Sequence, residues 1–132
     1  MNLLLLKVTV VAIGGGLGAG LRFLASEATH DLLGRHFPFG TLVVNVIGSL
    51  LIGYLLVLLP EGREPVPHLR LLLITGLLGG FTTYSSFSIE TLQLLQEGAM
   101  DKALLNIAAT FLVCLFAVWG GFALARVVHG GS

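Results

Sequence analysis

The chain has 132 residues, of which 55% are hydrophobic and only 11% are charged, and seven Lys and Arg residues balance seven Asp and Glu residues. With a mean hydropathy of +0.96, it has too few polar residues to cover the surface of a soluble globule of this size. The balanced charge also excludes a basic surface for nucleic acid. The composition therefore indicates an integral membrane protein without a separate soluble domain.

Four segments are apolar enough to span a bilayer, which requires roughly 20 residues for a hydrocarbon core of about 30 Å. We expect one all-α membrane domain over residues 1–132, whose short loops contain the four prolines. The apolar residues Leu3–Leu6 precede Lys7, the reverse of a signal peptide's order, so the first segment is expected to be retained. The predicted spans are about Leu3 to Ser26, Thr41 to Leu59, Leu69 to Leu95 and Ala103 to Val128.

The Lys and Arg residues are divided almost evenly between the two ends of the predicted bundle. Four spans place both chain ends on one side, which gives Lys7, Arg63, Arg70 and Arg126 against Arg22, Arg35 and Lys102. The numbers of Lys and Arg residues in short loops normally set the orientation of a membrane protein. A division as even as this one therefore specifies the orientation only weakly. We expect insertion in both directions and an antiparallel dimer, which would supply an inverted repeat. The alternative is that a single helix or loop charge decides the orientation.

The first span combines closely spaced glycines with one arginine. Gly14 and Gly18 are four residues apart, as are Gly16 and Gly20, a spacing that lets two membrane helices approach closely. Arg22 follows them. An arginine costs about 3 kcal/mol at the membrane centre and less near an interface, where it can snorkel. Arg22 is therefore either a snorkelling residue or a fixed charge that concentrates anions at a vestibule.

The second and fourth spans each carry an asparagine among apolar residues. Asn45 lies between branched residues, and Ser49 follows four positions later. Such an amide either donates hydrogen bonds to a solute or joins helices with about 1 kcal/mol. In the fourth span Asn106, Thr110 and Cys114 are spaced four residues apart. We expect this stripe to face protein or water rather than lipid.

The third span is expected to be broken. Gly76, Gly79 and Gly80 are followed by the hydroxyl-rich run F-T-T-Y-S-S-F-S at positions 81–88. Irregular backbone at membrane depth is tolerated where it is buried in protein or lines a cavity, and broken helices expose groups that coordinate ions. The alternative is an unbroken helix whose hydroxyls bond to its own carbonyls. Glu90 is expected to be a solvated or capped end of this span.

The polar residues within the predicted spans suit a small anion. With no central Asp or Glu, the spans lack the usual proton relay or cation counter-charge, whereas amide and hydroxyl donors favour an anion. Tyr84 and Phe87, three residues apart, can present ring edges that carry the positive end of the aromatic quadrupole. These features predict a narrow anion path without distinguishing fluoride, chloride and formate.

Three stretches resemble the Fluc (CrcB) fluoride channel family. They are G-G-L-G-A-G-L-R-F at Gly15–Phe23, G-T-L-V-V-N-V-I-G at Gly40–Gly48 and G-L-L-G-G-F-T-T-Y-S-S-F at Gly76–Phe87. The resemblance implies a passive, fluoride-selective channel of the bacterial plasma (inner) membrane, which exports fluoride after hydrofluoric acid enters and dissociates. It also implies an antiparallel dual-topology homodimer in membrane lipid, with two pores and a central structural sodium ion (Na+).

The resemblance also assigns roles to single residues. The implied fluoride-pore residues are Asn45, Tyr84, Ser85, Phe87 and Thr110, with Arg22 at the vestibule. Backbone oxygens of Gly79 and Thr82 would hold the sodium ion. Two positions depart from the commonest family pattern, because Tyr84 stands where Phe is usual and Cys114 where a hydroxyl is frequent.

Other classes of protein fit less of the sequence. A small multidrug-type antiporter would need a membrane-embedded glutamate in its first span, where this chain has Arg22 and no acid before Glu27. A purely structural subunit is favoured if the polar residues only join helices. An enzyme is disfavoured, since no nucleophile with a base and no cluster of metal ligands lies within the spans.

Overall fold

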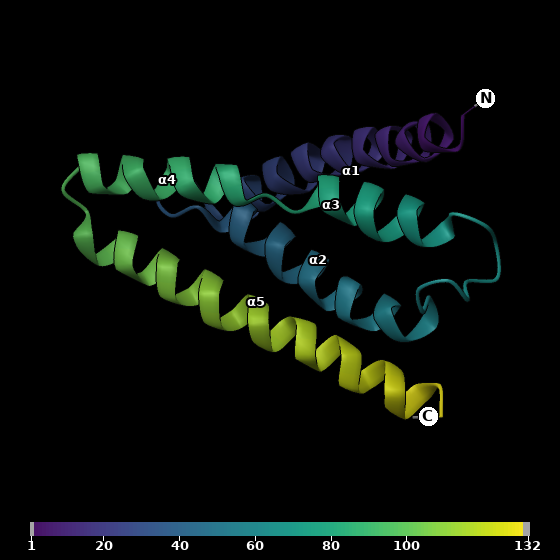
Figure 1. The fold of residues 1–132 in the computed structure, drawn as a ribbon. Coiled ribbons are helices and arrows are strands. Elements are labelled where there is room, and N and C mark those ends of the chain that lie inside the picture. Colours follow the sequence, from purple (N-terminus) through teal and green to yellow (C-terminus); the bar gives the residue numbers. More distant parts are fainter. Residues whose placement is uncertain (1, 131–132) are drawn as a thin grey trace.

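The structure, a computed structural model, describes residues 2–130 and consists of helices and loops over that range (Figure 1). Its elements are α1 (Leu3–Leu33), α2 (Phe39–Leu58), the π-helix η1 (Leu71–Leu78), α3 (Gly79–Phe81), α4 (Tyr84–Gln96) and α5 (Met100–Val128). Among the described residues, α1, α2, the stretch Leu71–Gln96 and α5 are long and apolar enough to cross a membrane. The four predicted spans are confirmed, and the protein is a multi-pass membrane protein.

The first helix is longer than predicted. It continues past Ser26 to Leu33, through a segment that contains the good helix formers Glu, Ala and Leu. The helix ends at Gly34, whose φ of 90° is a conformation that glycine adopts without steric cost. The N–H of Gly34 donates to the His30 carbonyl at 2.8 Å, so the last turn is closed before the chain turns toward α2.

The helices form a bundle in which α2 packs mainly on α5, and α1 mainly on η1 and α3. Figure 1 shows both marked chain ends at one end of the molecule, with the α1–α2 and α4–α5 connections at the opposite end. Both chain ends therefore lie at one end of the bundle, as the assignment of Lys and Arg residues to its two ends assumed. The α2–η1 loop lies at the end that holds the chain termini.

Glycines set the distance between α1 and the third span. A Cβ atom at Gly14 would lie 2.6 Å from the Leu72 carbonyl oxygen, and one at Gly18 would lie 2.0 Å from the Leu77 carbonyl oxygen. The predicted packing role of these two glycines is confirmed. A Cβ at Gly16, and likewise at Gly20, would meet nothing within 4 Å, so this second pair faces outward from the described chain.

Gly121→Ala is expected to weaken the α2–α5 contact by about 1–3 kcal/mol. Its Cβ would lie 2.0 Å from the Leu50 carbonyl oxygen, and backbone cannot give way as a side chain can. Gly120→Ala is the matched control, because a Cβ there would meet nothing within 4 Å and alanine favours helix. Thermal unfolding in detergent should show a lower midpoint for Gly121→Ala alone. Equal midpoints for the two variants would contradict this account of the packing.

The third span is broken, as predicted, and the break falls at two threonines. Thr82 has φ −86° and ψ 159°, and Thr83 has φ −152° and ψ 120°, so both are extended. Gly79 and Gly80, by contrast, are helical. The Thr83 side chain accepts a hydrogen bond from the Ser86 N–H at 3.1 Å, which caps the start of α4. The break lies about midway along the bundle in Figure 1.

Candidate functional site

An open cavity of about 250 Å³ lies beside the break. It is lined by Asn45, Ser49, Ile52, Thr82, Thr83, Tyr84, Phe87, Thr110 and Cys114. These residues come from α2, the break, the first turn of α4 and α5. The structure therefore brings together four of the predicted pore residues, Asn45, Tyr84, Phe87 and Thr110.

Asn45 is bonded at both ends of its amide to the backbone of Thr83. Its Nδ2 donates to the Thr83 carbonyl at 3.0 Å, and its Oδ1 accepts from the Thr83 N–H at 2.7 Å. The two bonds satisfy backbone groups that the broken helix would otherwise leave without partners inside the membrane. An amide nitrogen carries two hydrogens, and the bond to Thr83 uses one. Asn45 thus joins α2 to the break, and the bond to the Thr83 carbonyl uses only one of its two amide hydrogens.

The break takes several backbone carbonyls, including those of Gly79 and Thr82, out of the helical pattern. In a continuous helix each N–H donates to the carbonyl four residues earlier, so the Thr83 N–H would bond Gly79 and the Ser86 N–H would bond Thr82. Instead, the Thr83 N–H donates to Asn45 and the Ser86 N–H donates to the Thr83 hydroxyl. The Gly79 and Thr82 carbonyls are thereby released from the helix ladder at mid-membrane depth. Uncharged carbonyl oxygens of this kind suit a hard cation.

Arg22 lies on α1 outside the lining of this cavity. Its Nε donates to the Gly80 carbonyl at 3.1 Å, and the residue is half-buried. Arg22 therefore connects the first span to the residues just before the break. Its action as a vestibule charge stays a prediction.

The aromatic and hydroxyl residues occupy the α4 side of the cavity. The rings of Tyr84 and Phe87 meet edge to face, with centroids 5.5 Å apart and planes at 62°. Phe87 is half-buried, whereas Tyr84 is 80% exposed. The Ser85 hydroxyl is exposed and lies 3.2 Å from the Thr83 hydroxyl, outside the cavity lining. The Thr83 hydroxyl at the cavity and the exposed Ser85 hydroxyl are therefore neighbours.

Asn106 plays a structural role beside this cavity. It is 2% exposed, and its Nδ2 donates to the Thr91 hydroxyl at 3.0 Å. Thr91 in turn donates to the Phe87 carbonyl at 2.8 Å, so Asn106 ties α5 to α4. The stripe of Asn106, Thr110 and Cys114 was expected to face protein or water, and this is confirmed. Asn106 faces protein, and Thr110 and Cys114 line the cavity.

The expectation that Glu90 is a solvated or capped end of the helix is wrong. The helix α4 continues to Gln96, so Glu90 lies within it, is half-buried and accepts a hydrogen bond from the Thr41 hydroxyl of α2. The pair was missed because its members are 49 positions apart. Within the third span, Glu90 is thus an acidic residue held by a partner in another helix.

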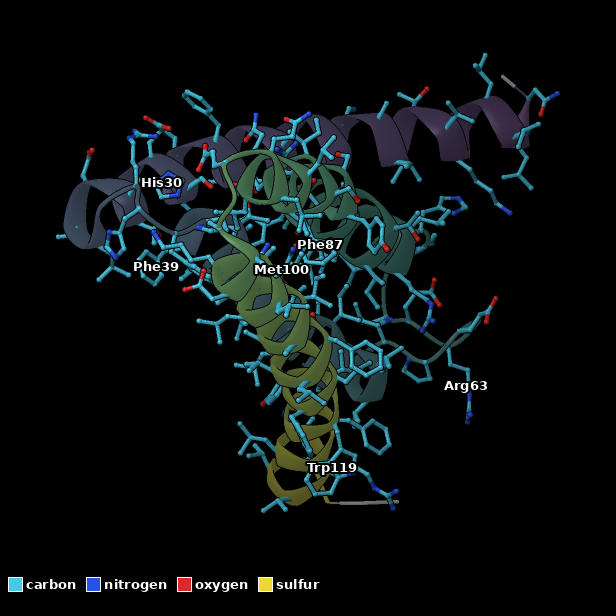
Figure 2. The ribbon with its side chains drawn as sticks, turned by 90° about the vertical axis from the view of Figure 1, so that its left-hand side faces the viewer. His30, Phe39, Arg63, Phe87, Met100 and Trp119 are labelled. Atoms are coloured by element: carbon cyan, nitrogen blue, oxygen red, sulfur yellow. The ribbon has the colours of Figure 1, made fainter. Side chains whose placement is uncertain are left out.

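A second open cavity, of about 320 Å³, lies beside Glu90 at the end of the bundle that holds the α1–α2 and α4–α5 loops. Its lining includes the basic residues His30, Arg35, His36 and Lys102, and Figure 2 shows His30 at this end. The His30 Nε2 accepts the Gly40 N–H at 3.1 Å, which fixes the first turn of α2. Basic and neutral polar groups therefore share this cavity with two carboxylates, the half-buried Glu90 and the exposed Glu97.

The family model described as "CrcB-like protein, Camphor Resistance (CrcB)" matches residues 9–122. The chain belongs to this family. The match covers α2, the break and the cavity-lining part of α5. The resemblance predicted from the three sequence stretches is therefore confirmed.

This CrcB-family chain is similar over most of its length to proteins named "Fluoride-specific ion channel FluC". The one from Magnetococcus marinus is 43% identical over 124 residues, which cover 93% of this chain and 100% of the relative. The one from Shewanella loihica is 49% identical over 111 residues, or 84% of this chain and 89% of the relative. The one from Methylococcus capsulatus is 44% identical over 127 residues, and the match spans 96% of this chain but 56% of that longer relative.

Proposed function

We propose that this chain is a passive, fluoride-selective channel and not an enzyme. The observation that carries the proposal is the cavity at the helix break, where Asn45, Tyr84, Phe87 and Thr110 meet. The relatives named as fluoride-specific ion channels support fluoride as the ion. Hydrofluoric acid enters a cell uncharged and dissociates, and the channel then lets the fluoride leave across the plasma (inner) membrane.

The proposed mechanism rests on replacing the water of the ion. A small anion holds its hydration shell tightly, so it crosses the membrane only where fixed donors substitute for that shell. The free hydrogen of the Asn45 amide and the hydroxyl of Thr110 are such donors. The ring edges of Tyr84 and Phe87 add positive electrostatic potential without a competing cation. Because these groups are neutral, the ion is stabilised without being trapped.

We propose further that two copies, inserted in opposite directions, build two such pores together. The even division of Lys and Arg residues supports insertion in both directions. Tyr84 is 80% exposed, and a Cβ at Gly16 or Gly20 would meet nothing within 4 Å, so each of these positions leaves room for a second copy. Each pore would then combine α2 and α5 of one copy with aromatic residues of the other.

A structural sodium ion completes the proposal. The Gly79 and Thr82 carbonyls would hold it, since both are released from the helix ladder by the bonds of Asn45 and Thr83. The ion would neutralise carbonyl dipoles at the break, where the two copies cross, and fix their separation. No carboxylate is needed for this role.

Fluoride efflux from liposomes tests the function. Purified protein in liposomes loaded with potassium fluoride and placed in a potassium-free medium should release fluoride to an electrode once a potassium ionophore lets potassium leave with it. Liposomes loaded with potassium chloride should release no chloride under the same conditions. Efflux of both anions, or of neither, would refute a fluoride-selective channel. Tracer sodium in the same liposomes should stay inside, and sodium flux in a fixed ratio to fluoride would show a coupling site instead of a structural one.

The dual topology predicts accessibility from both sides of the membrane. With Cys114 replaced by alanine, a single cysteine added after Ser132 should react with a membrane-impermeant maleimide partly from outside intact cells and fully after lysis. Labelling from one side only would contradict insertion in both directions. Two additional arginines in the α2–η1 loop should shift labelling to one side and reduce efflux, because antiparallel partners would become scarce.

A further inference from the structure

Two hollows follow one another along the outer face of α5. The larger, of about 560 Å³, is lined by Leu56, Val57, Pro60, Arg63, Phe122, Arg126 and His129. The other, of about 370 Å³, is lined by Leu112, Leu115, Phe116 and Trp119. The first is therefore both basic and apolar, and the second is purely apolar.

The two hollows share one face of the helix. Trp119, Phe122 and Arg126 are three and four residues apart, which places them in one row along α5. At 1.5 Å per residue, Arg126 lies roughly 10 Å beyond Trp119 along the helix axis. The buried residues Asn106 and Gly121 mark a different face, which packs inside the bundle. Trp119 is 69% exposed, as expected for a side chain in contact with lipid.

The basic hollow is built from neighbouring aromatic and cationic groups. The Arg126 guanidinium lies 5.6 Å from the centroid of the Phe122 ring. The His129 Nε2 is 2.8 Å from the Tyr54 hydroxyl, and their rings meet edge to face. Arg63 lines the hollow from the loop after α2. Figure 2 labels Arg63 on this loop and Trp119 on α5. Two arginines and a histidine thus line this hollow together with four apolar residues.

The charges of the whole chain single out this end of the bundle. The end with the chain termini carries Lys7, Arg63, Arg70 and Arg126 against Glu61 and Glu64, whereas the other half carries Arg22, Arg35 and Lys102 against Glu27, Asp31, Glu90, Glu97 and Asp101. Cations therefore exceed acids at the terminal end, and acids exceed cations at the other. The net charge therefore favours an anionic ligand at the terminal end over the other end.

We propose that this face of α5 binds an anionic phospholipid. The phosphate lies between Arg63 and Arg126, because guanidinium groups match phosphate oxygens in geometry and charge. One acyl chain follows the row past Phe122 into the apolar hollow and rests against Trp119. The order of the two hollows, basic at the helix end and apolar toward the membrane interior, matches the order of headgroup and chain in a phospholipid.

Trp119 is the only tryptophan of the chain and reports directly on this site. Purified protein is reconstituted in phosphatidylcholine bilayers in which a fixed fraction of lipid carries bromine in the acyl chain, on either phosphatidylglycerol or phosphatidylcholine. Brominated phosphatidylglycerol should quench Trp119 fluorescence more, with an apparent relative affinity about fivefold above that of phosphatidylcholine. Raising the salt concentration should reduce this preference, since salt screens exposed charges.

The variants separate charge at this site from charge elsewhere. Arg63→Gln with Arg126→Gln should bring the relative affinity close to one, and the paired lysine substitutions should keep most of the preference. Arg35→Gln, at the opposite end of the bundle, is the matched control and should change nothing. Unchanged quenching by brominated phosphatidylcholine checks that a variant is inserted and folded.

Three results would overturn the proposal. Equal quenching by the two brominated lipids would remove the preference itself. If the preference for phosphatidylglycerol survives both the double glutamine substitution and high salt, the binding site lies elsewhere on the chain. Relief of quenching by added glycerol 3-phosphate would assign the basic hollow to a soluble phosphate compound instead of a lipid. The assay does not measure ion flux, so its outcome is independent of whether the chain conducts fluoride.

Discussion

Asn45→Asp is expected to abolish fluoride efflux, by a factor of about 10² or more, the loss typical of removing a fixed donor from an anion-stabilising site. Aspartate has almost the shape of asparagine, but it replaces the amide hydrogens with acceptor oxygens. A charged carboxylate at this position would also repel fluoride across the narrow cavity. Both effects act on passage of the ion.

The same substitution is also expected to weaken the break. The Asn45 Nδ2 now donates to the Thr83 carbonyl at 3.0 Å, and a carboxylate oxygen there would face another acceptor. Loss of that bond should cost about 1–3 kcal/mol, seen as a lower unfolding midpoint in detergent. A variant that keeps its size-exclusion profile while losing efflux would separate the two effects.

Asn106→Asp is the matched control for the loss of efflux. Asn106 is also buried, but its partner is the Thr91 hydroxyl, which can turn and donate to a carboxylate, whereas the Thr83 carbonyl cannot. We expect Asn106→Asp to retain most of the efflux. Normal efflux by Asn45→Asp would remove Asn45 from the pathway. Equal loss in both variants would show that any buried acid in this region blocks the ion.

Phe87→Ile is expected to reduce fluoride efflux about tenfold, because an aromatic edge contributes roughly 0.5–1.5 kcal/mol beyond its buried area. Isoleucine keeps an apolar side chain in the half-buried position but has no ring quadrupole. It also leaves Tyr84 without the partner that holds its ring at 5.5 Å. The backbone carbonyl of Phe87, which accepts from Thr91, is unaffected, so α4 should stay folded.

Electrode measurements on liposomes with matched protein content would check this expectation. Phe116→Ile is the control, since Phe116 is 68% exposed on the outer face of α5 and belongs to the apolar hollow. It should change efflux little. If Phe87→Ile conducts like the unmodified chain, the ring edge plays no part in passage. If it fails to fold, Phe87 is a packing residue and no pore role follows.

Local features of the sequence were sufficient to predict the four spans and the break. Span length follows from apolar composition, which is a property of each segment by itself. The paired glycines before a run of hydroxyl residues indicated a poor helix, and the chain becomes extended just after them, at Thr82 and Thr83. The family resemblance implied the pore residues, and four of them, Asn45, Tyr84, Phe87 and Thr110, line one cavity.

The hydrogen-bond partners of the polar residues within the spans could not be predicted from the sequence. Asn45 and Thr83 are 38 positions apart, Thr41 and Glu90 are 49 apart, and Arg22 bonds a carbonyl 58 positions away. A polar side chain in a membrane needs some partner, but composition and spacing leave several candidates open.

What the sequence determined by itself was the set of spans, the near-even division of Lys and Arg residues and the place where the third helix fails, because each depends on local composition and backbone preference. What only the tertiary structure decided was the use of each polar group. It placed Gly14 and Gly18 in a contact and left Gly16 and Gly20 open, and it turned Glu90 from a helix end into a bonded acid. The physical reason is that helix crossing brings together atoms from distant positions, and only that geometry fixes which donor meets which acceptor.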